Sequence, residues 1–197
     1  MKTLKVRWTG IRPLVLHNGL LADPTNECVV AIKKITAKKN KKTDSDNEEL
    51  ARLEWLGGLY LAADRKTIVI PSDNIERAIQ DGAKKSRLGK DAQAAVFCSE
   101  PEVEIEHDAI RGRSPESLYA DESGRFILRK GVKVTMSRVI RVRPMIPTGW
   151  SLNFTVEFDE TIINARNLEQ SMVDAGALVG LGDWRPKFGR FTSEVLP

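Results

Sequence analysis

The sequence predicts an α+β fold of the ferredoxin-like, RRM-like type, in which the elements follow the order βαββαβ. Alternation of apolar and polar residues over 132–143 and 151–159 is typical of half-buried strands. Apolar residues at helical spacing over 165–178 predict a helix, and a closing strand follows at 188–195. In this motif the antiparallel sheet packs both helices on one face and leaves the other face free.

The first strand is predicted over residues 3–9, where Leu4, Val6 and Trp8 alternate with lysine, arginine and threonine side chains. Successive side chains of a strand point to opposite faces, so this strand has one apolar and one cationic face. The stretch "IRPLVLHNGLLADPTNE" predicts a loop. It is followed by the run 33–42, which carries six lysines and no acidic residue.

Capping-box patterns predict where two helices begin. Asp46 with Glu49 opens a helix that the glycine pair 57–58 interrupts, and Asp73 opens a helix over 73–86. The apolar face of the second helix is formed by Ile75, Ala78, Ile79 and Gly82. A short strand, "KTIVIP", is predicted just before it.

The chain is predicted to form a single domain over residues 1–197, with insertions at about 19–65 and 91–130. Residues 91–130 contain turn-forming residues and no clear period, which predicts a surface insertion. Within it, "EVEIEHD" is compatible with a short strand.

The most regular alternation covers residues 132–143. Only Arg138 and Val139 interrupt it, which is compatible with a bulge or a frayed middle. Together with 151–159, this segment predicts a long antiparallel pair with one buried and one polar face.

The free face of the predicted sheet is expected to be basic. It would display Lys5, Arg7, Lys133, Arg141 and Arg143, with Thr135 and Asn153 between them. Such a face neutralises phosphates and offers hydrogen bonds to them. The alternative is an ordinary solvated strand face, where lysines discourage aggregation. No aromatic side chain is found at these outward positions, so loops rather than the sheet would grip a strand of nucleic acid.

The stretch "VGLGDWRPKFGRF", residues 179–191, combines backbone freedom, a flat ring and positive charge. Gly180 and Gly182 would let backbone N–H groups approach an anion, and Trp184 or Phe188 would stack on a base. The cations of this loop are Arg185, Lys187 and Arg190. The alternative is a tight helix-to-strand connection with Trp184 in the core.

The lysine-rich run is a second candidate contact. Its side chains Lys38, Lys39, Lys41 and Lys42 would touch phosphates if the segment folds over nucleic acid as a basic flap. The alternative is a mobile, solvated loop.

Composition narrows the class of protein. Hydrophobic residues make up 41% and charged residues 29% of the chain, with a net charge of +4, which is typical of a soluble globular protein. We expect a cytoplasmic protein without membrane contact, because no apolar run is long enough to span a bilayer and the start lacks a signal-peptide core. Cys28 and Cys98 are expected to be reduced thiols, and no cofactor or metal site is expected.

The sequence contains few residues in arrangements typical of an enzyme active site. His17 and His107 are the only imidazoles, and no serine or cysteine has a recognisable nucleophile setting. Asp23 and His17, which flank the loop after the first strand, leave a nuclease as an open alternative.

Three stretches together resemble the RAMP superfamily: "RPLVLHN", "IPSDNIERAIQDGAKK" and the glycine-rich loop before the last strand. Within it, the chain is most similar to the backbone subunit that lines the guide RNA in class 1 CRISPR effector complexes. The similarity covers residues 3–18, 66–90 and 131–195, and the segments between would be the family's "fingers" or "thumb" insertions. The ending "DWRPKFGRF" also resembles phage proteins.

The resemblance implies sequence-independent binding of single-stranded nucleic acid by a protein that polymerises head to tail along it. It implies contact with other effector-complex subunits as well. The residues that would lie beside the strand are His17, Asn18, Gly180, Gly182, Arg185 and Gly189. One branch of the family cleaves target RNA with an aspartate in the first loop, and Asp23 is the one candidate for that position.

Three hypotheses therefore remain open. The chain is a non-catalytic binder of single-stranded nucleic acid, a metal-dependent ribonuclease, or an interaction protein whose basic face meets an acidic partner. A phage single-stranded DNA-binding protein is a variant of the first hypothesis. RNA and DNA are not distinguished, because contacts to a 2′-hydroxyl leave no signature in one sequence.

Overall fold

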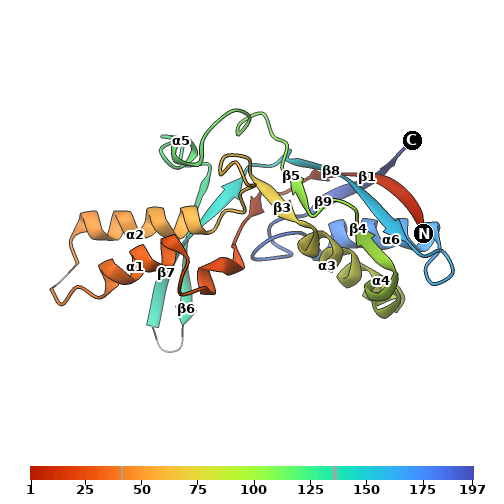
Figure 1. Ribbon diagram of the computed structural model, residues 1–197, viewed down its shortest axis with the longest axis horizontal. Helices are drawn as coiled ribbons and strands as arrows, with labels where there is room; N and C mark the ends of the chain where they lie inside the picture. Colours follow the sequence, from red (N-terminus) through yellow and green to blue (C-terminus); the bar gives the residue numbers. More distant parts are fainter. Residues whose placement is uncertain (41, 135–136) are drawn as a thin grey trace.

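The computed structural model describes residues 1–40, 42–134 and 137–197, and shows a mixed α+β fold with antiparallel sheets. Figure 1 shows a body, in which helices lie along one face of a sheet, and an arm, in which two helices and a β-hairpin project from the body. Both chain ends lie at the end of the body away from the arm.

The sheet of the body has the strand order β4-β8-β1-β9, and all neighbours run antiparallel. Its strands are β1 (Lys2–Gly10), β4 (Val96–Cys98), β8 (Ser151–Phe158) and β9 (Phe191–Leu196). The alternation predicted for the first strand is confirmed, because Val6 and Trp8 are buried whereas Lys5 and Arg7 are exposed.

Helices α3 (Ser72–Ala83) and α6 (Ala165–Asp174) cover the apolar face of this sheet (Figure 1). The predicted apolar face of α3 is confirmed, since Ile75, Ala78 and Ile79 are buried. At Gly82 a Cβ atom would lie 2.6 Å from the backbone nitrogen of Ala175, so glycine permits the close approach of α3 to the end of α6. The helix predicted over 165–178 changes at Ala175–Val179 into the π-helical turn η3.

Aromatic side chains fill the centre of the body. The indole of Trp8 stacks on Phe191 with the ring centroids 4.0 Å apart, and it meets the edge of Phe154 at 4.9 Å. Trp150 is also fully buried, and its Nε1 donates to the carbonyl oxygen of Arg12 over 2.8 Å. This core fixes the loop after β1 against the sheet.

In the arm, α1 (Glu27–Thr36) packs beside α2 (Asp44–Gly57). Thr43 and Asp46 form the capping box at the start of α2, each side chain accepting from the other's backbone N–H. The prediction that Asp46 with Glu49 caps the helix was therefore wrong by one turn. The prediction for Asp73 was also wrong, because α3 follows Pro71 without a side-chain cap.

The predicted strand 132–143 is a β-hairpin instead. Strands β6 (Ile127–Val134) and β7 (Ser137–Ile146) pair with each other, and β7 also pairs with β2 (Leu14–Val15). The edge of the main sheet beside β8 belongs to β4. Alternation continues from one arm of the hairpin into the other, so the periodicity hides the turn, and no glycine or Asn-Gly pair marks it.

Residues 91–130 are more ordered than the predicted surface insertion. They contain most of α4 (Gly89–Ala95), then β4, β5 (Glu102–Glu104) and α5 (Pro115–Tyr119), and β5 pairs with β3 (Val69–Pro71). The remaining short helices are η1 (Gly19–Ala22) and η2 (Lys84–Ser86). Across the parts of the chain that the structure describes, no helix is long and apolar enough to cross a membrane.

Candidate nucleic-acid interface

Two adjoining cavities share His17 at the junction between arm and body. The smaller one measures about 190 Å³, and the larger one about 710 Å³. The walls of the smaller cavity include His17, Tyr60, Asn74, Arg77, Asp183 and Arg185. Segments from the first loop, from α3 and from the glycine-rich loop therefore meet at one place.

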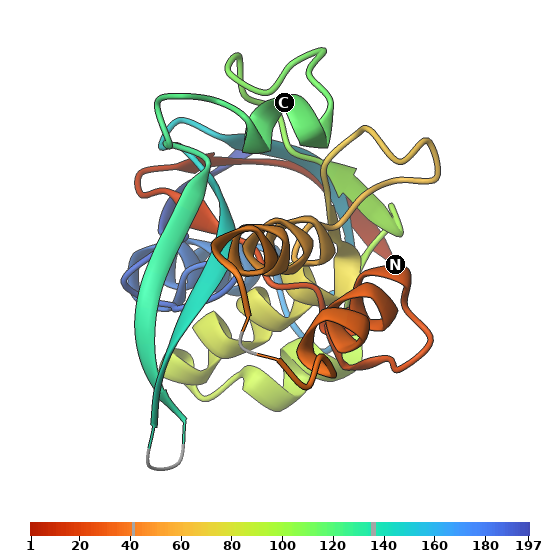
Figure 2. The ribbon, with the colours of Figure 1, turned by 90° about the vertical axis from the view of Figure 1, so that its left-hand side faces the viewer.

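The larger cavity is a groove of the arm. Figure 2, viewed from the arm's end, shows α1 and the hairpin β6–β7 on opposite sides of α2. Apolar side chains of α1 and β7 face this groove, among them Val29, Ile32 and Ile140, together with Arg141. Ile140 is 61% exposed, so the wall formed by β7 is open to solvent.

His17 and Asn18 have different roles in this junction. Asn18 is used by the fold, because its Nδ2 donates to the carbonyl oxygen of Leu59 and its Oδ1 accepts from the backbone of Leu20. His17 is exposed, and its ring lines both cavities. Partial desolvation lowers the pKa of His17 from its ordinary value of 6.5, and the nearby Arg143 guanidinium lowers it further.

The glycines of the loop serve close packing. Gly180, Gly182 and Gly189 have φ angles of +80°, +78° and +70°, which other residues rarely adopt. A Cβ atom at Gly182 would collide with the carbonyl oxygen of Val15, and one at Gly189 with that of Leu181.

Several backbone donors of this loop are already occupied. The N–H of Asp183 donates to Val15 over 2.7 Å, and the N–H of Gly189 donates to Pro13 over 2.8 Å. Gly180 donates to Ala175. These bonds hold the loop to its own chain, so the N–H groups of Gly180 and Gly189 are not free for an anion. For the N–H of Gly182, contact with an anion stays a prediction.

Trp184 lies at the surface of the loop. Its side chain is half-buried, whereas Trp8, Trp55 and Trp150 are at most 1% exposed. The Nζ of Lys130 lies 4.7 Å from its ring centroid. Trp184 is therefore not part of the buried core, and its half-buried ring lies next to a cation.

Arg185 and Arg77 converge on Asp81 of α3. Asp81 Oδ2 lies 3.2 Å from the Nε of Arg77 and 3.9 Å from an Nη of Arg185, and Asp81 Oδ1 accepts from Lys84. Three cations thus share one carboxylate, which leaves an excess of positive charge. Arg77 was missed in the sequence, because a cation on the polar side of a helix carries no local mark of function.

Arg141 and Arg143 lie on β7 rather than on the sheet of the body. Arg141 has a side chain 40% exposed and lies 3.5 Å from Glu54. Arg143 is 8% exposed and pairs with both Glu54 and Asp183. The predicted basic sheet face is therefore wrong, because Arg141 and Arg143 belong to the hairpin and not to the sheet of the body. Lys133 belongs to β6 of the same hairpin, and Thr135 lies outside the described residues.

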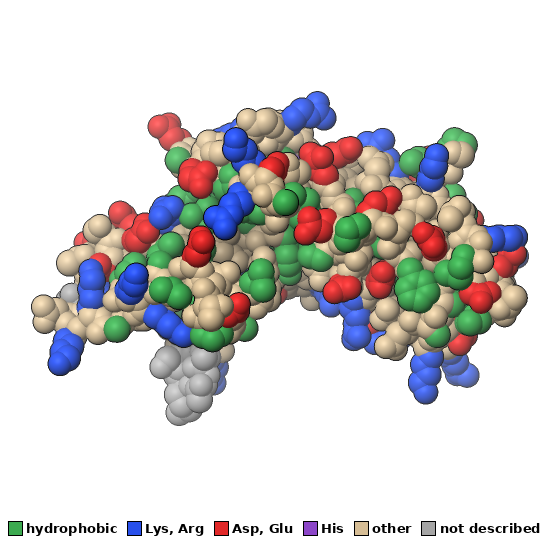
Figure 3. All heavy atoms as spheres, viewed as in Figure 1, with side chains coloured by type: hydrophobic (Ala, Val, Ile, Leu, Met, Phe, Trp, Pro, Cys, Tyr) green, Lys and Arg blue, Asp and Glu red, His purple; other side chains and the backbone are tan. Residues whose placement is uncertain are grey.

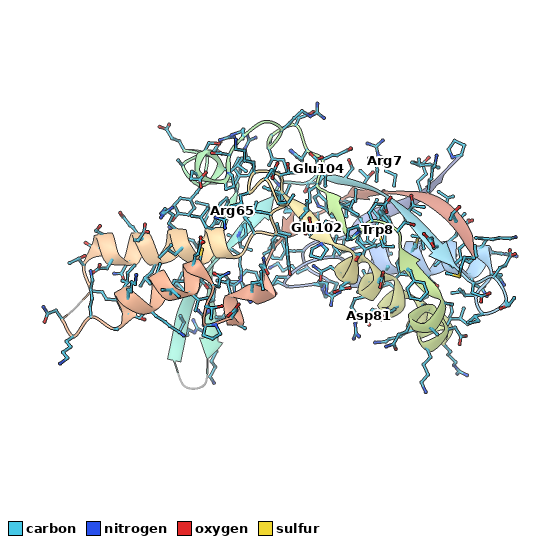
Figure 4. All side chains as sticks on the ribbon, in the orientation of Figure 1. Arg7, Trp8, Arg65, Asp81, Glu102 and Glu104 are labelled. Atoms are coloured by element: carbon cyan, nitrogen blue, oxygen red, sulfur yellow. The ribbon has the colours of Figure 1, made fainter. Side chains whose placement is uncertain are left out.

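Arg7 lies on the opposite side of the sheet from this junction. Figure 4 shows Arg7 above the sheet and Asp81 below it. Arg7 is paired in register with Glu194 and Asn153, and Asn153 donates to Glu106. That face therefore mixes both signs of charge.

The remaining predicted cations are spread out. Lys38, Lys39 and Lys42 belong to the segment between α1 and α2, and Lys41 lies outside the described residues. Figure 3 shows Lys and Arg side chains at the free end of the arm, whereas acidic side chains are frequent on the visible face of the body. Lys187 and Arg190 border a separate cavity of about 380 Å³ with Arg12.

Asp23 and His107 have structural roles. The carboxylate of Asp23 accepts from the backbone N–H and the hydroxyl of Thr25, which lowers its pKa. The Nδ1 of His107 accepts from the N–H of Ala109, and its Nε2 lies 3.2 Å from the carbonyl oxygen of Thr148. Among the described residues, no three His, Cys, Asp or Glu side chains gather in a metal-binding arrangement.

Comparison with known proteins leaves the family open: the sequence matches no family model and no curated protein.

Proposed function

We propose that this protein binds single-stranded nucleic acid, with RNA favoured, through the phosphate backbone and without sequence selectivity. The observation that carries the proposal is the junction between arm and body, where cations line two adjoining cavities and a half-buried tryptophan stands next to one of them. His17, Arg77, Arg141 and Arg185 line the cavities. Trp184 precedes Arg185 in the chain, and Lys130 lies over its ring. Cations bind phosphates of any sequence, and an aromatic ring stacks on any base.

Arrangement of the elements supports a ferredoxin-like assignment of the body. The strand order is β4-β8-β1-β9, α3 lies between β1 and β4 in the chain, and α6 lies between β8 and β9. This is the order of a split βαββαβ motif in which β4 replaces the strand expected at 132–143. It favours a relationship to the RAMP superfamily, with the arm as the family's insertions.

By the same resemblance, the protein assembles head to tail along the strand, alone or with other subunits of an effector complex. We place it in the cytoplasm of a bacterial or phage-infected cell. Its role is proposed to be non-catalytic, because Asp23 is engaged by Thr25 in a turn that precedes α1. Asp23→Ala is expected to leave both nucleic-acid binding and the length of the bound RNA unchanged.

Fluorescence anisotropy with labelled oligouridylate, oligodeoxythymidylate and mixed-sequence RNA tests the proposal across a salt series. We expect binding to all three that weakens as salt rises, and weaker binding by Arg77→Ala. Arg7→Ala is the matched control, because it removes an arginine from the opposite face of the sheet. Binding that ignores salt, or equal losses in the two variants, would overturn this assignment of the interface.

A further inference from the structure

Arg143 is the most buried Lys or Arg side chain among the described residues. It is 8% exposed, although it belongs to a strand whose neighbouring arginine, Arg141, reaches solvent. Its two carboxylate partners come from different elements, Glu54 from α2 and Asp183 from the glycine-rich loop. A cation in this position has little surface to offer to a phosphate.

The geometry makes Arg143 a bridge. Its Nη1 donates to Glu54 Oε1 over 2.7 Å, and its Nε donates to Asp183 Oδ2 over 3.2 Å. The guanidinium carbon lies 5.9 Å from the ring centroid of Trp184. One planar side chain therefore connects the hairpin, helix α2 of the arm and the loop that carries Trp184 and Arg185.

Both partners are themselves fixed. Glu54 Oε2 accepts from the backbone N–H of Val142, so α2 holds β7 by a second bond beside Arg143. The N–H of Asp183 donates to Val15 of β2, which pairs with β7. Trp184 has a φ of +53°, a conformation that a non-glycine residue keeps only when its surroundings hold it.

We propose that Arg143 is a positioning residue, which holds the glycine-rich loop against the hairpin so that Trp184 and Arg185 face the nucleic acid. It does not contact a phosphate itself, because leaving its partners would remove the cation that pairs with Asp183 and would leave Glu54 with only the longer contact to Arg141. This role rests on the proposed nucleic-acid function, and it reassigns a residue that the sequence suggested as a direct phosphate contact.

Substitutions at Arg143 separate positioning from phosphate contact. Arg143→Lys keeps the charge but has one nitrogen where two are needed, so it cannot reproduce both bonds. We expect it to lower the affinity of the folded protein for oligouridylate by roughly tenfold, with the slope of log affinity against log salt unchanged. Asp183→Asn, which leaves the pair of Arg143 with Glu54 in place, is expected to lower affinity in the same way if Arg143→Lys does not fold.

Arg141→Gln is the matched control, since Arg141 is on the same strand and exposed. It is expected to reduce the salt slope by about 0.7, because one phosphate of a single strand is then no longer neutralised by the protein. Hydrogen exchange in the free protein gives the independent readout. Arg143→Lys should speed exchange in 181–189 and in β6–β7, and Arg141→Gln should not.

Wild-type affinity together with wild-type exchange in Arg143→Lys would overturn the proposal. A second substitution, Arg143→Gln, removes the charge. If Arg143→Gln reduced the salt slope by as much as Arg141→Gln does, Arg143 would be a phosphate contact and the proposal would be overturned. The exchange experiment needs no ligand. A protein that fails to bind any oligonucleotide but shows the expected exchange would refute the proposed function while supporting the bridge.

Discussion

At the residue scale, the glycine-rich loop combines two kinds of residue with separate tasks. The glycines allow the loop to touch its own chain, while Arg185 is exposed and Trp184 is half-buried. The sequence shows that glycines, an aromatic ring and cations occur together in this loop. It does not show whether the glycines approach a ligand or pack against the protein, because close approach to either one requires the same positive φ.

The roles of Trp184 and Arg185 can be separated by binding and melting measured together. Arg185→Ala is expected to weaken binding by ~1–3 kcal/mol with little change of melting temperature, because it removes a charge-assisted hydrogen bond. Trp184→Ala is expected to cost ~1–3 kcal/mol of binding for each base that stacks on the ring. Unchanged affinity in both folded variants would show that the loop has a structural role and does not contact nucleic acid.

Gly182→Ala tests whether close packing is the reason for this glycine. Its Cβ would collide with the Val15 carbonyl, so we expect a lower melting temperature and a displaced loop that binds oligonucleotides more weakly. Gly112→Ala is the matched control, because Gly112 also has a positive φ, +69°, but nothing within 4 Å of the added atom. Equal destabilisation by the two changes would mean that backbone conformation alone matters.

At the scale of elements, the body was more predictable than the arm. Strands β1 and β8 and helices α3 and α6 each place one face in the core, and that burial imposes the periodicity by which they were found. The hairpin β6–β7 has the same alternation but pairs with β2, and local pattern carries no information about which partner a strand chooses. Short β4 was missed because three residues are too few to show a period.

The candidate site was predictable only in part. Trp184 and Arg185 were singled out because a loop that combines glycines, an aromatic ring and cations is unusual, and His17 was singled out by the resemblance of "RPLVLHN" to the RAMP superfamily. Arg77 and Lys130 were missed, since a cation on the polar side of a helix or strand has no local mark of function. Only the fold brings α3, the loop and the hairpin together.

The lysines of the run 33–42 are expected to add affinity for nucleic acid without sequence selectivity. Lys38, Lys39, Lys41 and Lys42 changed together to Ala should weaken every single-stranded oligonucleotide similarly. The salt dependence should flatten by roughly 0.7 for each phosphate that the variant no longer neutralises. Lys38 already pairs with Asp46, which leaves it less free than its neighbours to contact a phosphate. An unchanged salt slope would mean that this segment is only solvated.

At the scale of the whole molecule, the net charge bears on the proposed assembly of copies along a strand. Each chain carries a net charge of +4, so copies repel one another at low salt. In the proposed complex, the phosphates of the strand would remove that repulsion by neutralising the basic junction and arm. Assembly is therefore expected to depend on the strand, and a head-to-tail contact that does not close gives an open filament.

This expectation is tested by mass measurement on oligouridylates of increasing length. The free protein should remain monomeric. The number of copies bound to each strand should rise stepwise with strand length. Partly filled strands should be rare, because neighbouring copies bind cooperatively. Raising the salt should release protein and dissolve the filament together, because both depend on the same phosphates. A single copy on every strand, whatever its length, would show that the protein binds as an isolated unit. Filaments in the absence of nucleic acid would instead show that contacts between copies suffice without the strand.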